Sequence, residues 1–250
     1  MGNFSFLFSK RSKKGQITVF IIIAIIIVGL GVFLFISKDV FIKKDKPYSP
    51  NIAPIVNFIE NCFEETLEDA VHTLSKNGGY YSPINVTETG ESYYLFEGNN
   101  YFPSKENIEK DLSKYIDNMF FICSKYFEDF SDYEIEQSNV ESSSKLFEDK
   151  IILNVHYPLS IQKGSSSVIL RDFEIEYPST FGSVYTDISF FIEEDVLSED
   201  FCLSCISDIS EYDGLSSYVS SQKNNTFIFI ITDKNPINKK PIEWVFANKY

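Results

Sequence analysis

Histidine, cysteine and tryptophan are scarce in this chain of 250 residues, which has two, four and one of them respectively. Histidine is the commonest general base and a common metal ligand, so two such residues leave little room for a site of either kind. The sequence also lacks a P-loop, an HExxH helix, a GxSxG turn and a dinucleotide-binding glycine fingerprint. We find no catalytic constellation, and we predict that the chain is not an enzyme and carries no cofactor.

Positive charge is also scarce beyond residue 46. Residues 1–46 hold eight basic and two acidic side chains, so the net charge of −14 for the whole chain leaves −20 for residues 47–250. A charge of that size keeps a domain soluble and repels phosphate backbones. Nucleic acid is therefore excluded as a partner, and the remaining length is sufficient for a domain with its own core.

One segment lacks charge altogether: Ile17–Ile36 is a run of twenty hydrophobic or small residues. A helix of that length spans roughly 30 Å, the thickness of the hydrocarbon core of a bilayer. The sequence predicts a single-pass transmembrane helix here, with the lipid bilayer as a partner. The chain would then consist of a basic tail (1–16), the span (17–36), a linker (37–50) and an acidic domain (51–250).

The flanks of this segment predict its orientation in the cell membrane. Residues 10–14 include four basic side chains and no acidic one, whereas Asp39 and Asp45 are interspersed among the lysines that follow the span. The positive-inside rule therefore favours a cytoplasmic N-terminus and a C-terminal domain outside the cell.

Hydrophobic periodicity predicts an α+β fold of amphipathic helices and antiparallel strands for the outer domain. Helical spacing indicates helices at 55–74, 104–130 and 181–196, and a short one near 202–209. Alternating or aromatic runs predict strands at 93–96, 101–102, 134–137, 150–157, 168–177, 226–232 and 242–247. Apart from its short strand, the acidic and serine-rich stretch 131–145 is expected to be a loop.

The cysteines form two pairs along the chain. Cys62 and Cys123 lie on the apolar stripes of the first two helices, so packing those stripes together would bring the thiols within bonding distance. An outward-facing domain sits in an oxidising compartment, so we expect a disulfide; two buried free cysteines are the alternative.

Cys202 and Cys205 form a lone CxxC motif. Their acidic neighbours oppose the lowered thiol pKa that redox chemistry requires, and zinc would need a second close pair of ligands that the sequence lacks. We predict a local structural disulfide, with a redox pair or half of a zinc site as the alternatives.

The remaining polar residues are interpreted more simply. His72 and His156 are expected on the surface. The stretch Ser142–Lys145 formally matches an SxxK motif, but it lies in the predicted loop and its partner motifs are missing. The acidic clusters at 64–69 and 193–195 lack the spacing of a calcium-binding loop, so we expect them to be solvated helix faces.

Two kinds of motif indicate modification. Asn85 and Asn224 begin N-glycosylation sequons. The run Lys13–Thr18, Lys-Lys-Gly-Gln-Ile-Thr, resembles the class III (prepilin-like) signal of archaea, in which a peptidase cuts after the glycine and leaves the hydrophobic helix on the mature protein. This resemblance implies cleavage between Gly15 and Gln16; an uncleaved signal anchor is the alternative. Phe20 stands where pilins usually carry glutamate, which argues against self-polymerisation.

Over most of its length, the chain resembles uncharacterised membrane-anchored surface proteins of archaea. The resemblance rests on Gly15-Gln16 with the following span, the Cys62 helix ending in Gly78-Gly79, the Cys123 helix and the closing strand Trp244–Ala247. It implies location and architecture but no activity. Our hypothesis is a structural or protein-interaction protein, pilin-like in layout, that contacts other envelope proteins. The alternative is an extracytoplasmic enzyme or thiol-redox factor that uses Cys202 and Cys205.

Overall fold

The computed structural model describes residues 22–23, 26, 48–197, 214–238 and 240–250. The chain divides into two compact units, residues 1–47 and residues 48–250. In the first unit Ile22, Ile23 and Ile26 are helical, and the rest of the predicted span lies outside the described residues. The second unit is a mixed α+β fold, which agrees with the fold class that the sequence predicts.

Helix α2 (Ala53–Lys76) is the predicted first helix of the domain. Pro54 lies in its first turn, where the missing N–H has no partner to lose. The helix ends at Asn77, after which Gly78 and Gly79 adopt φ values of +66° and +81°. The Gly79 N–H donates to the carbonyl of Leu74, which closes the helix as the glycine pair predicts.

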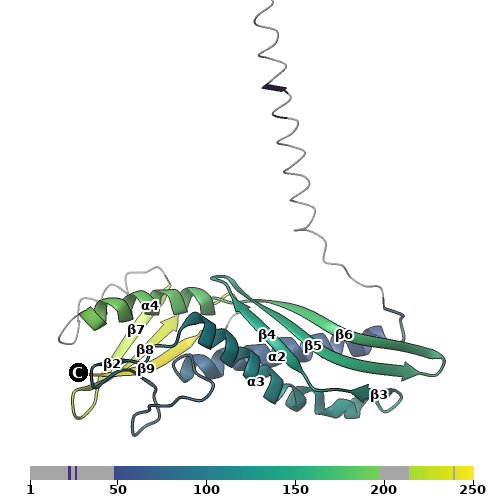
Figure 1. The fold of residues 1–250 in the computed structure, drawn as a ribbon, viewed down its shortest axis with the longest axis horizontal. Helices are drawn as coiled ribbons and strands as arrows, with labels where there is room; N and C mark the ends of the chain where they lie inside the picture. The colour runs from purple at the N-terminus through teal and green to yellow at the C-terminus, as the bar shows by residue number, and fades with distance from the viewer. Residues whose placement is uncertain (1–21, 24–25, 27–47, 198–213, 239) are drawn as a thin grey trace, which may run out of the picture. The chain divides into compact units, whose positions relative to one another are not determined.

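A five-stranded sheet in the order β2-β1-β9-β8-β7 forms one end of the domain (Figure 1). Its strands are β1 (Tyr93–Phe96), β2 (Asn99–Asn100), β7 (Leu215–Ser221), β8 (Thr226–Asp233) and β9 (Glu243–Lys249). The closing hairpin β8–β9 is antiparallel, as predicted. Three details differ from the prediction: β1 and β9 pair in parallel, the partner strand of β1 comes before residues 101–102, and β7 was not expected.

Helix α4 (Phe181–Leu197), also predicted, lies over this sheet (Figure 1). Its Phe191 ring centroid is 5.4 Å from that of Phe229 on β8, and its Phe181 ring stacks on Trp244 of β9 at 4.9 Å. Burial of these rings is the main favourable term in attaching the helix to the sheet. The Trp244 Nε1–H donates to the Tyr94 hydroxyl at 2.6 Å, so the buried indole has a partner.

Helix α3 (Lys105–Ser124) begins at the predicted N-cap, because the Ser104 side chain accepts a hydrogen bond from the Asn107 N–H. It ends six residues earlier than expected. A short 3₁₀ segment, η1 (Lys125–Phe130), follows, and positive φ values at Lys125, Tyr126 and Phe127 break the helical ladder. The apolar periodicity continues through this break, which explains why the sequence indicated one longer helix.

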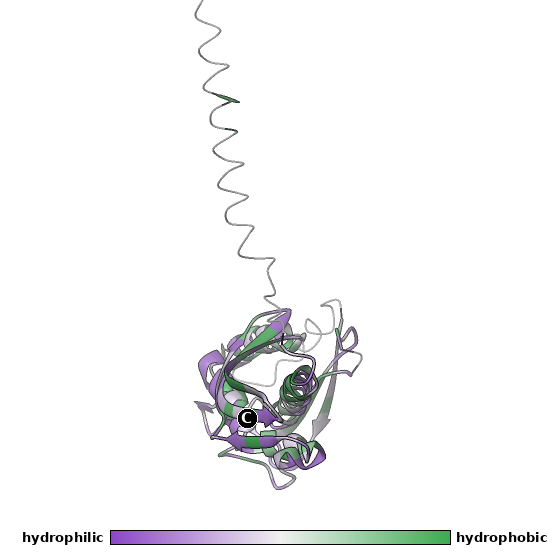
Figure 2. Ribbon diagram, turned by 90° about the vertical axis from the view of Figure 1, so that its right-hand side faces the viewer, coloured by the Kyte–Doolittle hydropathy of each residue, from purple (hydrophilic) through white to green (hydrophobic). Residues whose placement is uncertain are grey.

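A second sheet, in which three strands pair with β5, forms the other end (Figure 1). Its strands are β3 (Glu134–Gln137), β4 (Glu141–Leu146), β5 (Lys150–Lys163) and β6 (Ser166–Pro178). The hairpin β5–β6 and the short strand β3 are confirmed. The loop expected up to Lys145 is wrong, since β4 occupies most of its second half. Hydrophobic and hydrophilic residues are interspersed along the ribbons of the domain (Figure 2), and along β5 buried residues alternate with more exposed ones over most of its length.

Helices α2 and α3 cover the inner face of this second sheet. Phe63 of α2 stacks on Phe120 of α3 with 4.1 Å between ring centroids, and both rings contact Tyr157 of β5. Helix α2 also contacts β9 of the first sheet, so it links both halves of one continuous core. The side chains of β5 that point away from these helices form the outer face of the sheet.

Candidate functional site

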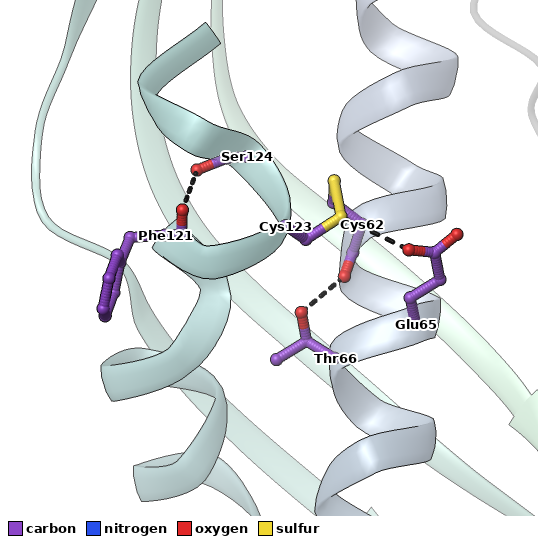
Figure 3. Close-up of a disulfide and its surroundings, with 6 residues drawn as sticks. All are labelled: Cys62, Glu65, Thr66, Phe121, Cys123 and Ser124. Carbon is purple, nitrogen blue, oxygen red and sulfur yellow. Dashed lines mark hydrogen bonds between the residues drawn. A yellow bond between two sulfur atoms is a disulfide. The ribbon is translucent and has the colours of Figure 1, made fainter.

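A disulfide joins the two long helices (Figure 3). The sulfur atoms of Cys62 on α2 and Cys123 on α3 are 2.07 Å apart, and their Cα atoms are 5.5 Å apart. Cys62 is buried, whereas Cys123 is partly accessible. The bridge is the one that the two apolar stripes predict. It closes a segment that includes β1, β2 and the first nineteen residues of α3, and a bond of this kind persists in an oxidising compartment.

An acidic side chain lies against the accessible half of this bridge. Figure 3 shows Glu65, one turn along α2, with its Oε2 atom 3.5 Å from the Cys123 sulfur. A bridged sulfur has no proton to donate, so the contact places a negative charge beside the bond rather than a hydrogen bond. An attacking thiolate would have to approach this charge, because the other sulfur is buried.

Side chains of α3 satisfy the backbone N–H groups along β4 on the edge away from β5. The N–H of Ser142 donates to Asp117 Oδ1 at 2.8 Å, that of Ser144 donates to Ser113 Oγ at 2.9 Å, and that of Leu146 donates to Glu109 Oε1 at 3.0 Å. We call these six residues the α3–β4 seam. The spacing fits, since four helical residues rise about 6 Å and two strand residues about 6.8 Å.

The seam masks a strand edge that would otherwise be open to another chain. An unpaired edge is a template for intermolecular β-pairing, and native proteins cover such edges. Glu109 is buried at 9% exposure, and its second oxygen accepts a 2.7 Å hydrogen bond from Lys145. The stretch Ser142–Lys145, which formally matches SxxK, is thus a structural strand whose inward serines hydrogen-bond to a helix.

The outer face of the β4–β5–β6 sheet carries a row of polar residues. Glu141, His156 and Asp172 stand opposite one another on three neighbouring strands, and Ser143, Asn154 and Glu174 form the next row. These side chains line a shallow, open depression of about 500 Å³. His156 Nδ1 lies 2.8 Å from Asp172 Oδ1. The prediction that His156 lies on the surface is confirmed.

An irregularity in strand pairing sets the composition of this row. The register between β5 and β6 shifts by one residue between His156 and Leu159, where Pro158 stands. Without the shift, His156 would face Phe173 instead of Asp172, and a buried ring would be turned to the outer face. Proline is tolerated at such a position because no ladder N–H is required there.

The outer face of this sheet is an accessible acidic surface, and its carboxylates determine what it can bind. The side chains of His156 and Asp172 are 52% and 79% exposed, so water screens their attraction and the pair contributes roughly 0–1 kcal/mol. Three carboxylates, on Glu141, Asp172 and Glu174, surround the single histidine. Lysine or arginine side chains of a partner can form charge-assisted hydrogen bonds with carboxylates presented in this way.

His72 is less accessible than expected. It is half-buried beside Tyr177, Asn238 and Lys240, and burial lowers the pKa of its imidazole, with the positive charge of Lys240 adding to the effect against the opposing charge of Glu68. The folded environment therefore favours the uncharged form of this imidazole.

The acidic cluster at 193–195 also needs a correction. Asp195 is 1% exposed rather than solvated, and its Oδ2 accepts hydrogen bonds from Asn248 Nδ2 and the Tyr250 hydroxyl. The carboxylate therefore fastens the end of α4 to the last residues of the chain. Periodicity on α4 could not show this, because both partners lie more than fifty residues away.

The glycosylation candidates lie on surface turns. Asn85 is partly exposed in the segment before β1, and Asn224 is exposed in the β7–β8 turn with φ +59°. Gly15, Gln16, Cys202 and Cys205 lie outside the described residues, as does the short helix expected near 202–209. Within the described ranges, no helix is long and apolar enough to cross a membrane, and no three metal-ligating side chains converge on a site.

Comparison of the chain with protein-family models, with curated proteins and with solved structures found no match. The candidate surface therefore stands on its own geometry. Sequence reasoning missed Asp172, Glu141 and Glu174 as neighbours of His156. The hairpin turn at Gly164 would have placed the two strands together, but the register shift near Pro158 leaves no sequence signal that fixes the opposing residue.

Proposed function

We propose that the chain is a membrane-anchored, extracytoplasmic protein with a structural or protein-interaction role in the cell envelope. The observation that carries the proposal is the Cys62–Cys123 disulfide between the two long helices. Reducing cytosol keeps such thiols apart, whereas an extracytoplasmic compartment preserves the bond. The uncharged run at residues 17–36 supplies the anchor in this proposal, and the basic flank before it supplies the orientation.

The proposed contact surface is the outer face of the β4–β5–β6 sheet. Its open shape and three accessible carboxylates suit a basic patch on another envelope protein better than an enclosed small molecule. The large negative charge of the domain adds long-range attraction toward such a partner. Binding would then weaken as salt rises, because charges this exposed are screened.

Protease treatment of intact cells tests the location. Added protease should remove residues 47–250 and leave the anchor with the membrane, and peptides recovered under non-reducing conditions should contain the 62–123 bridge. Detergent-opened cells serve as the control for protease activity. A domain protected in intact cells, or free thiols at both positions, would contradict the proposal.

A photo-crosslinking amino acid at Asn154 tests the contact surface. Asn154 is exposed at the centre of the polar rows, and Lys223, exposed in the β7–β8 turn of the other sheet, is the matched control. Irradiation of intact cells should give a discrete cross-linked product from position 154 and none from position 223. The substitution Glu174→Lys reverses the charge at this position and should remove that product. Equal products from both positions would refute this surface.

A further inference from the structure

Three large apolar side chains are exposed together where α3 ends and η1 begins. Phe121, Ile122 and Tyr126 are 47%, 59% and 66% exposed, and the rings of Phe121 and Tyr126 stack with centroids 6.1 Å apart. We call these three residues the η1 tip. Isolated apolar residues on a surface are ordinary, whereas a contiguous aromatic and aliphatic group marks a contact.

The backbone at this point is held in an unusual conformation that exposes the tip. Lys125, Tyr126 and Phe127 have φ values of 41°, 52° and 61°, a left-handed region that crowds the Cβ of any residue except glycine. The turn directs Phe127 into the core, where it is 4% exposed and contacts Phe58 of α2. Tyr126, its neighbour, is left outside. Packing on one side of the turn therefore fixes an apolar side chain on the other.

The residues that follow the tip lie close to the point where the domain begins. The Phe130 ring of η1 is 4.9 Å from Phe58 in the second turn of α2, and the Tyr133 hydroxyl donates to the carbonyl of Asn51 at 2.7 Å. The domain begins at Tyr48, twelve residues after the uncharged run ends at Ile36. Twelve residues span at most roughly 40 Å.

We propose that the η1 tip rests in the headgroup region of the bilayer that the chain's own N-terminal helix crosses. The inference relies on the proposed function for that anchor, and it adds a second membrane contact within the folded domain. Tyrosine and lysine favour the interface between headgroups and acyl chains, and phenylalanine and isoleucine gain by burying apolar area at that boundary. Glu128 and Asp129 follow the tip, so apolar burial rather than attraction to anionic lipid drives the contact.

Fluorescence quenching in reconstituted full-length protein tests this contact. The native tryptophan, Trp244, is 0% exposed and serves as a common background that lipid-bound quenchers cannot reach. Tyr126→Trp and Ile122→Trp place a reporter in the tip at two independent positions. Tyr218→Trp is the matched control, because Tyr218 is 64% exposed on β7 in the other sheet. Each variant is reconstituted into phosphatidylcholine vesicles with and without a shallow doxyl-labelled lipid.

We expect the tip reporters to be quenched at least about threefold more than the reporter at 218, with emission shifted to the blue on reconstitution. Equal, weak quenching at all three positions in protein that floats with the vesicles would refute the tip contact alone. Protein that fails to float with the vesicles would refute the anchor, and with it the proposed function. A blue shift without doxyl quenching would assign the tip to a second copy of the chain and overturn the lipid contact.

Discussion

The disulfide between α2 and α3 allows a quantitative prediction about the stability of the domain. Cys62 and Cys123 are separated by 61 positions, so the bond restricts a long loop in the unfolded chain. The chain-entropy model gives about 4 kcal/mol for a loop of this size, and measured losses for native bridges are about 2–5 kcal/mol. We expect Cys62→Ala and Cys123→Ala each to lower the free energy of unfolding by that amount.

The double variant separates the bond from the side chains that form it. Each single substitution breaks the same bond. The free energy of unfolding of the double variant Cys62→Ala/Cys123→Ala should therefore be less than about 1 kcal/mol below that of either single variant. The single variants should differ slightly from each other, because Cys62 is buried and loses packing while Cys123 is partly accessible. Reduced wild-type protein supplies the control, since it lacks the bond but keeps both sulfur atoms.

Denaturant unfolding of the full-length chain in detergent micelles measures these differences. Trp244 is the only tryptophan and is buried against Tyr94 and Phe181, so its emission reports unfolding of the core. Two results would refute the reasoning. Losses that add in the double variant would mean that the two residues act as separate core residues. A wild-type midpoint unchanged by reduction would mean that the bond does not restrict the unfolded chain.

Three further predictions concern single residues. The pKa of Asp117 is raised from 3.8, chiefly by desolvation, so ionisation weakens the fold as pH rises through the raised pKa. Asp117→Asn keeps an acceptor for the Ser142 N–H, so this variant should gain stability relative to wild type as pH rises from 3 to 7. Asp117→Ala lacks the acceptor and should lower the free energy of unfolding by about 1 kcal/mol. Thermal unfolding measured across this pH range tests both expectations. Gly182→Ala should lower the free energy of unfolding by at least about 2 kcal/mol in the same assay, because a Cβ at this position would lie 1.9 Å from the Phe147 carbonyl oxygen. Unchanged stability would contradict this packing. Glu65→Gln should speed reduction of the bridge by an anionic thiol but not by a cationic one. Equal effects on both thiols would show that the charge of the carboxylate does not slow attack on the disulfide.

Some elements follow from local patterns because the same residues supply both the signal and the structure. The apolar stripe of α2 ends at Asn77, and the two glycines after it accept the left-handed backbone that closes the helix. The alternation in β5 places six apolar side chains on one face, and the turn at Gly164 returns the chain as β6. Each of these predictions depends on residues that are close together in the sequence.

Other elements depend on partners far away in the chain, which local patterns do not reveal. The parallel pairing of β1 with β9 joins residues about 150 positions apart, and a hairpin pattern carries no information about it. The spacing of Asp195 predicts part of an acidic helix face, whereas its hydrogen-bond partners, Asn248 and Tyr250, come from the end of the chain. On the outer face, the neighbours of His156 were likewise decided by a register shift rather than by spacing.

Strand β4 lacks the pattern by which a strand is recognised, so its acidic, serine-rich sequence predicts a loop. A strand is normally recognised by apolar or β-branched residues on its buried face, yet Ser142 and Ser144 occupy inward positions here. Their hydroxyl groups donate to backbone carbonyls of α3, so burial costs little. The matching signal lies on α3, where Glu109, Ser113 and Asp117 repeat every four residues. A polar residue on the buried side of a helix is therefore informative only when the strand that it meets is known.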